Sequence, residues 1–297
     1  MKTLNQTPAE ETKRILSEVI ALYILEESLR DIYVEGITDK NFYQNYLDSK
    51  KIDGNFVPIT SINFLSINEE FKNKLDVNSN KDMVIALSRA FNKQPKRLNV
   101  RCIVDRDFDD YTYVEENDYL WRTDFTCLES YLFCIDIKNK FIKMGLVNFP
   151  IESKKVLNEI GRVIKFLFSI RLWKEINNSS VDLVEIDKNL KVNKNNGETN
   201  FDEEDYIDKF ILKNNLKKEE EKFKKEIKAL QGQLNIDVRF AMNKKDFLKV
   251  FYLYVNKIKN IPNYTEEAFS KALYLTPECS HLEVYPLFEK IEDFFSE

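Results

Sequence analysis

The chain has 297 residues, of which 43% are hydrophobic and 13% aromatic, and this composition excludes a globally disordered protein. Its 45 lysines and arginines against 50 aspartates and glutamates give a net charge of −5, which argues against a non-specific nucleic-acid coat protein. The single histidine, His281, lies near the C-terminus in a segment where a capping or surface role is expected. Ser-His-Asp triads and histidine-based zinc sites are therefore disfavoured, and any catalysis would depend on carboxylates and lysines.

The four cysteines lie far apart and form no CxxC pair, so neither a zinc site nor a disulfide framework is indicated. No apolar run approaches the roughly 20 residues that span a bilayer. The opening segment lacks the apolar core of a signal peptide. These features predict a soluble, cytoplasmic protein with no membrane association.

The first half of the chain alternates between helical and extended patterns. A helix with Thr7 as its N-cap and Pro8 at its first position is expected to open the chain. Further patterns follow as a strand at 31–34, a helix at 40–47, a strand at 55–64, a helix at 79–93, strands at 98–105 and 118–123, and a helix at 127–135. Short strand–helix units in alternation predict the α/β class, with a parallel sheet flanked by helices over residues 1–145.

The second half, residues 146–297, is expected to form an all-helical C-terminal subdomain. Helical patterns cover 151–176, 206–234, 244–258 and 282–295. The segment 187–205 is polar, rich in asparagine and without periodicity, so a loop or linker is expected there.

Two carboxylates directly follow predicted strands of the sheet, Glu35 after the first and Asp105 after the third. Ligands of parallel sheets gather at the carboxyl ends of the strands, so both residues are expected at one functional edge. Gly36 is expected to allow a tight or positive-φ turn behind Glu35. Asp107 alternates with Asp105, so in an extended segment both side chains would project to the same side.

Carboxylates gathered in this way repel one another unless a cation or bound protons neutralise them. Their oxygen atoms suit Mg²⁺ or Mn²⁺ better than zinc. Such a cation can clamp a phosphodiester and lower the pKa of a bound water. The pattern therefore indicates metal-dependent chemistry on phosphodiester bonds.

Basic residues stand around the same predicted sheet. Arg101, Arg106 and Arg122 are candidates for binding substrate phosphates, although each alone also suits a surface ion pair. Lys40 stands next to the acidic cluster, where it would either approach the scissile phosphate in catalysis or balance the charge of Asp39.

The spacing of these motifs resembles a known family. A hydrophobic strand followed by Glu-Gly-x-x-Asp, and about 70 residues later a hydrophobic strand followed by Asp-x-Asp, is similar to the TOPRIM domain of topoisomerases, primases and OLD-type nucleases. The longer form "VEGITDKNFYQNYL", "IVDRDFDD" and "LESYLF", within residues 1–140, is most similar to the compact TOPRIM nucleases of bacterial anti-phage systems, including the PARIS effectors.

This resemblance implies roles for particular residues. Glu35 becomes a metal ligand and general acid/base, and Asp105 and Asp107 become Mg²⁺ ligands. Asp39 corresponds to a ligand of a second ion, although a charge that complements the start of a helix is the alternative. Glu129 corresponds to a further acidic ligand. OLD-type enzymes also use a late lysine, for which Lys244 and Lys245 are both candidates.

The function implied by the resemblance is a Mg²⁺- or Mn²⁺-dependent nuclease that cleaves RNA or DNA, with tRNA favoured. It would be the toxic effector of an anti-phage defence system, released from an ATPase partner, and a homodimer is compatible with this role. Two alternatives stay open: a catalytically silent TOPRIM module that serves an ATPase as sensor or scaffold, and a housekeeping nuclease for RNA maturation. A topoisomerase would need a larger strand-passage apparatus, and a primase would bring a zinc module.

Overall fold

The structure is a computed structural model in which residues 13–63, 79–112, 117–262 and 264–296 are described. The chain divides into two compact units. The sheet unit comprises 1–105, 114–124 and 278–297, and the helical unit comprises 106–113 and 125–277. This division differs from the expected boundary at residue 145, because the end of the chain packs with the sheet and residues 125–145 pack with the helices.

The sheet unit contains a four-stranded parallel sheet in the order β2-β1-β3-β4, which confirms the expected α/β class. Its strands are β1 (Asp31–Val34), β2 (Asn55–Pro58), β3 (Val100–Val104) and β4 (Leu120–Arg122). The expected strand at 55–64 is shorter than predicted, because a 3-10 turn (Ile59–Ser61) follows Pro58 directly.

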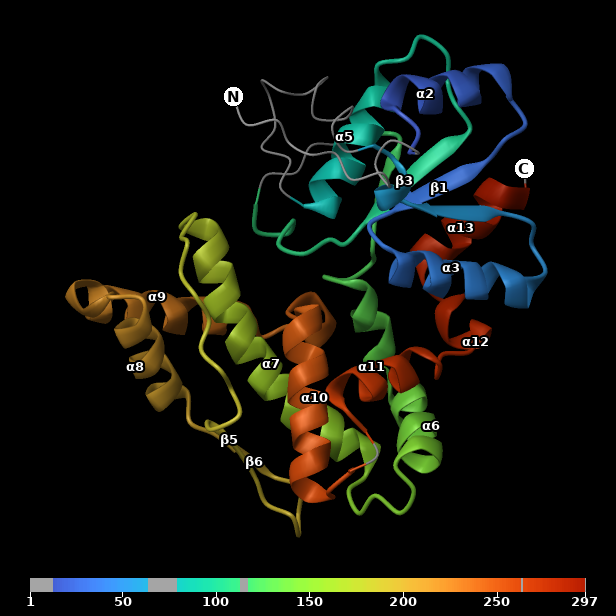
Figure 1. Cartoon of the computed structure of the whole chain (residues 1–297). Coiled ribbons are helices and arrows are strands. Elements are labelled where there is room, and N and C mark those ends of the chain that lie inside the picture. The colour runs from blue at the N-terminus through green and yellow to red at the C-terminus, as the bar shows by residue number, and fades with distance from the viewer. Residues whose placement is uncertain (1–12, 64–78, 113–116, 263, 297) are drawn as a thin grey trace. The chain divides into compact units, whose positions relative to one another are not determined.

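Helices cover both faces of this sheet (Figure 1). The helices α2 (Leu16–Leu25) and α5 (Asn80–Asn92) cover one face, where Tyr23 and Phe91 pack edge to face at 5.8 Å. The helices α3 (Ile37–Lys50) and α13 (Pro286–Ser296) cover the other. The expected helix start at Thr7 and Pro8 lies outside the described residues.

Aromatic side chains join α13 to the second face of the sheet. Phe56 of β2 stacks on Tyr43 at 5.3 Å and meets Phe295 edge to face at 5.9 Å. The short helix α12 (Cys279–Leu282) precedes α13, and the expected capping role of His281 is confirmed there: its Nδ1 accepts the Glu278 backbone N–H at 2.9 Å. The core of the sheet unit is therefore completed by the last part of the chain.

The helical unit is built around α7, which contacts α6, α9 and α10. Its helices are α6 (Ile135–Gly145), α7 (Ser153–Ile176), α8 (Glu203–Lys213), α9 (Glu220–Gln233), α10 (Lys244–Ile258) and α11 (Glu266–Tyr274). The expected helix at 127–135 is instead a 3-10 helix, η2 (Leu128–Leu132), followed by α6. Within the described part of the chain, no helix has the length and apolar character needed to span a membrane.

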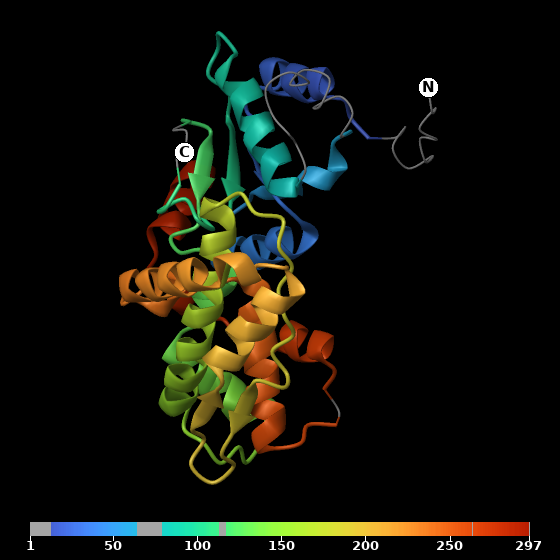
Figure 2. The same ribbon diagram turned by 90° about the vertical axis from the view of Figure 1, so that its left-hand side faces the viewer.

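The expected loop at 187–205 contains a hairpin of β5 (Leu190–Val192) and β6 (Thr199–Phe201), beside α10 and α7 (Figures 1 and 2). The second half of the chain is therefore not all-helical, and that prediction was wrong. Asparagine side chains build the turn, since Asn193 and Asn196 accept the backbone N–H groups of Asn195 and Glu198. Strands of three residues are too short to show a period in the sequence.

A buried carboxylate ties this hairpin to α7. Glu159 accepts the backbone N–H and the hydroxyl of Thr199, each at 2.8 Å. Burial alone would raise the pKa of Glu159, but the Thr199 hydrogen bonds and the Arg162 guanidinium lower it to about 2. The carboxylate therefore stays ionised across the whole physiological range.

Lys138 of α6 is buried without a hydrogen-bond partner for its Nζ atom. The amine lies over the rings of Phe247 and Phe251, 4.5 and 4.1 Å from their centroids. Burial lowers the pKa of Lys138 well below 10.5, while Cys134 opposes the shift. Dehydrating an ammonium group costs more free energy than two aromatic faces return, so this residue destabilises the fold.

Substitution of Gly197 by alanine should lower the free energy of unfolding by about 1–3 kcal/mol. Gly197 has φ +73°, and an added Cβ would lie 2.7 Å from the Tyr254 hydroxyl and 2.8 Å from Ile151. The matched control is Gly232→Ala in α9, where nothing lies within 4 Å and helix propensity should raise stability by up to about 1 kcal/mol. Urea denaturation of both variants checks the prediction, and equal stabilities would contradict it.

Substitution of Lys138 by methionine should stabilise the protein by about 1–3 kcal/mol at pH 7. The unfolded chain binds a proton at this lysine below pH 10.5, whereas the folded state resists it, so wild-type stability rises as pH approaches 10.5. The gain from Lys138→Met should shrink over the same range. Denaturation at several pH values measures this trend, with Lys143→Met on the exposed side of α6 as control. A gain that does not vary with pH would contradict the assignment.

Candidate functional site

Glu35 stands directly after β1, whose four residues are buried. Its Oε1 accepts the backbone N–H of Asp105 at 3.0 Å, and Asp105 directly follows β3. The Asn80 side chain at the start of α5 donates to the backbone carbonyl of Glu35 at 2.9 Å. The structure thus places Glu35 and Asp105 side by side at the carboxyl edge of the sheet, where both were expected, and joins the Glu35 carboxylate to the Asp105 backbone.

Gly36 has φ −150° and ψ 177°, an extended conformation, so the expected positive-φ turn is absent at this residue. A side chain at this residue would have limited space. A Cβ at residue 36 would lie 3.1 Å from Oδ2 of Asp39, in the first turn of α3. Asp39 therefore lies beside the Glu35–Gly36 turn and also at a helix N-terminus, where the dipole favours a negative charge.

The chain after Asp105 does not stay extended. Asp107 has φ +49° and begins a turn over residues 107–110, so the extended segment from which Asp105 and Asp107 were expected to project to one side is absent. The side chains of a turn do not follow the two-residue period of a strand. The Asp107 backbone N–H donates to the Thr126 carbonyl at 2.7 Å, and Arg106 forms an ion pair with Asp110 at 3.2 Å.

Glu129 in η2 is completely buried. Its Oε1 lies 2.7 Å from Nζ of Lys244 and also accepts a hydrogen bond from the Tyr274 hydroxyl. Its Oε2 is buried and has no hydrogen-bond partner. A buried carboxylate oxygen without a donor is costly, and it is the kind of atom that a metal ion or a protonated ligand group would satisfy.

This arrangement separates the two lysine candidates. Lys244 pairs with Glu129, whereas Lys245 is exposed and makes no ion pair with a described residue. Tyr274 was not found from the sequence, because 145 residues separate it from Glu129 and no pattern marks it.

The other basic candidates have varied surroundings. The Arg101 guanidinium lies over the rings of Tyr119, Trp121 and Phe294, 5.5, 5.7 and 5.2 Å from their centroids. Arg122 ends β4, in register with Val104. Lys40 lines a pocket along β2 and makes no ion pair among the described residues. Cation–π packing within the sheet unit thus accounts for Arg101 without a ligand.

The candidate metal ligands are all carboxylates, and hard oxygen donors suit Mg²⁺ or Mn²⁺. In the sheet unit these are Glu35, Asp39 and Asp105, and in the helical unit they are Asp107 and Glu129. The orphaned Oε2 of Glu129 fits a bound cation. Among the described residues, no three acidic, histidine or cysteine side chains stand close enough to form a metal site by themselves.

A scan against protein-family models and a search of curated proteins found no match to this chain.

Removal of the Lys244 ammonium should destabilise the protein, because it leaves the buried Glu129 carboxylate without its cation. Lys244→Ala is expected to lower the free energy of unfolding by about 1–3 kcal/mol. Lys245→Ala, one residue along α10, should change it by less than about 0.5 kcal/mol. Denaturation curves of the two variants measure the difference, and the double variant Glu129→Gln/Lys244→Ala should recover part of the loss. Equal effects of the two lysine substitutions would refute the pairing.

Proposed function

We propose that this protein is a divalent-metal-dependent nuclease of TOPRIM type that cleaves phosphodiester bonds in RNA or DNA. The observation that carries the proposal is the bond from the Asp105 backbone N–H to Oε1 of Glu35, at the carboxyl ends of β1 and β3. Parallel sheets bind their ligands at this edge. The Glu-Gly and Asp-x-Asp motifs that suggested the family are the segments that supply Glu35 and Asp105.

In this proposal Glu35 and Asp105 hold the cation, with Asp39 beside them. A Mg²⁺ ion held there would neutralise phosphate charge and lower the pKa of a water ligand. The Asp105 amide fixes the Glu35 carboxylate through one oxygen, so the side chain is oriented before any ligand arrives. By the resemblance, Asp107, Glu129 and Lys244 act in the same reaction, and the pairing of Lys244 with Glu129 supports Lys244 as the late lysine.

The resemblance also favours tRNA as the substrate and an effector role in anti-phage defence, under the control of an ATPase. The negative net charge supports dependence on a partner or on a particular substrate shape, because bulk attraction to a polyanion would require a basic protein.

One observation favours a second function, a catalytically silent TOPRIM module that acts as sensor or scaffold for an ATPase. No three ligand-type side chains cluster among the described residues, as a preformed metal site would require. Activity of the isolated protein separates the two proposals.

The purified protein should cleave members of a tRNA and DNA panel with Mg²⁺ or Mn²⁺, and EDTA should abolish cleavage. Glu35→Gln should reduce the rate about 100-fold or more, because it removes the charge that binds the metal. The amide oxygen of glutamine can still accept the Asp105 N–H, so the fold should be kept. Denaturing gel electrophoresis of end-labelled substrates measures the rates.

Glu26→Gln is the matched control, since Glu26 is exposed and lies in the same unit. It should cleave at the wild-type rate. Equal rates for wild type and Glu35→Gln would show that cleavage comes from a contaminant or another site. An inert wild type with either metal would favour the scaffold.

A further inference from the structure

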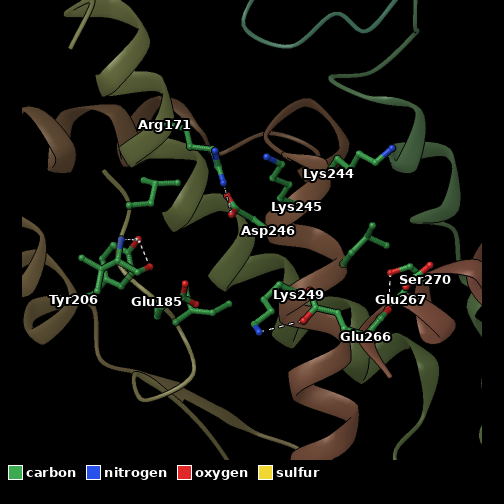
Figure 3. Close-up of a pocket in the computed structure, with 14 residues that line it drawn as sticks. Arg171, Glu185, Tyr206, Lys244, Lys245, Asp246, Lys249, Glu266, Glu267 and Ser270 are labelled. Carbon is green, nitrogen blue, oxygen red and sulfur yellow. Dashed lines mark hydrogen bonds and ion pairs between the residues drawn. The ribbon is translucent and has the colours of Figure 1, made fainter. Parts of the chain in front are cut away.

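The helical unit contains a pocket of about 680 Å³ lined by α7, the 183–186 segment, α8 and the starts of α10 and α11 (Figure 3). Its volume lies in the range of about 300–1,000 Å³ that is typical of small-molecule sites. Lys244, which pairs with Glu129, also lines this pocket. The pocket therefore borders one of the pairs assigned to the proposed reaction.

Three of the four carboxylates that line the pocket form ion pairs, and Figure 3 shows those of Asp246 and Glu266. Asp246 accepts two hydrogen bonds from Arg171, at 2.5 and 2.7 Å. Glu266 pairs with Lys249 at 3.1 Å, and Glu267 pairs with Lys271 at 2.6 Å. Glu185 is the lining carboxylate that makes no ion pair with a described residue.

Two cations of the pocket keep donors that a ligand can use. A guanidinium group has five N–H donors, and Asp246 takes one from Nε and one from Nη2 of Arg171. The other three N–H donors belong to the same guanidinium group, which the ion pair with Asp246 holds in a fixed orientation. Lys245 is exposed and unpaired among the described residues. Together these side chains provide a binding site for an anion such as a phosphate.

The pocket also has an apolar wall. Leu183, Val184 and Leu248 line this wall. The buried Tyr206 holds the 183–184 segment in place, because its hydroxyl donates to the Val184 carbonyl at 3.2 Å and accepts the Val184 backbone N–H at 3.3 Å. A ligand that satisfies every part of the lining combines a phosphate, a flat apolar ring and a hydrogen-bond donor for Glu185. A nucleotide with an exocyclic amine has this combination.

We propose that this pocket binds one unpaired nucleotide of the nucleic-acid substrate, an inference that rests on the proposed nuclease function. Arg171 and Lys245 bind its phosphate, the apolar wall contacts its base, and Glu185 accepts a hydrogen bond from its exocyclic amine. Proteins that act on nucleic acids commonly read unstacked bases in such pockets, through the edge of the base and its flat face.

Isothermal titration calorimetry of the full chain carrying Glu35→Gln, in EDTA, tests the pocket without cleavage. The probes are AMP, CMP, UMP and inorganic phosphate. AMP and CMP should bind more tightly than UMP, which lacks the exocyclic amine, and all three should bind more tightly than phosphate. Lys245→Ala should weaken AMP binding about tenfold, whereas Lys225→Ala, an exposed lysine of α9, should leave it unchanged.

Glu185→Gln should reduce the preference for AMP over UMP, which a merely structural role of Glu185 would not change. The proposal is overturned if no nucleotide binds saturably, if phosphate binds as tightly as AMP, or if Lys245→Ala binds AMP like the parent chain. If the wild type cleaves nothing but nucleotides bind, and Lys245→Ala weakens this binding, the pocket is supported and the nuclease function is rejected. If the wild type cleaves nucleic acid but binds no nucleotide, the nuclease function is supported and the pocket is rejected.

Discussion

The parallel pairing of β1 with β3 is the constraint on which the sheet unit depends. Each strand is buried, so its polar ends must find partners at the edge of the sheet. At the carboxyl edge the partner is a side chain, since the Glu35 carboxylate accepts a hydrogen bond from the Asp105 backbone N–H. A carboxylate held by a backbone amide lacks the freedom of a surface glutamate, and under the proposed function this fixed position would help Glu35 to bind an ion.

Glu129 presents a similar constraint in the helical unit. Its carboxyl group is buried, and Oε1 contacts both the Lys244 ammonium and the Tyr274 hydroxyl. The other oxygen, Oε2, has no hydrogen-bond partner. A purely structural ion pair would be expected to satisfy both oxygens. Lys138 shows a similar imbalance, since its buried Nζ atom has no hydrogen-bond partner among the described residues and lies over the rings of Phe247 and Phe251. The interior of this unit therefore contains more unsatisfied polarity than stability alone would favour.

The sequence was sufficient to predict the sheet, because short buried strands and amphipathic helices alternate clearly over residues 31–123. It also predicted that Glu35 and Asp105 would meet, since parallel strands share an edge. Other predictions failed for local reasons. Asp107 adopts a left-handed conformation that no period reveals, and the β5–β6 hairpin depends on asparagine side chains in its turn. Contacts such as Tyr274 with Glu129 join distant segments, and only the folded chain shows them.

The discontinuous sheet unit has a consequence for the order of folding. Phe295 and the rest of α13 complete one face of a sheet whose strands are synthesised long before them. On the ribosome, the apolar face under α13 would stay uncovered while the helical unit emerges and folds, since domains generally fold as units during synthesis. Most of the helical unit lies between β4 and α13 in the chain, so its synthesis separates the synthesis of the strands from the completion of the sheet unit. During that delay the carboxyl edge that bears Glu35 belongs to an incomplete unit.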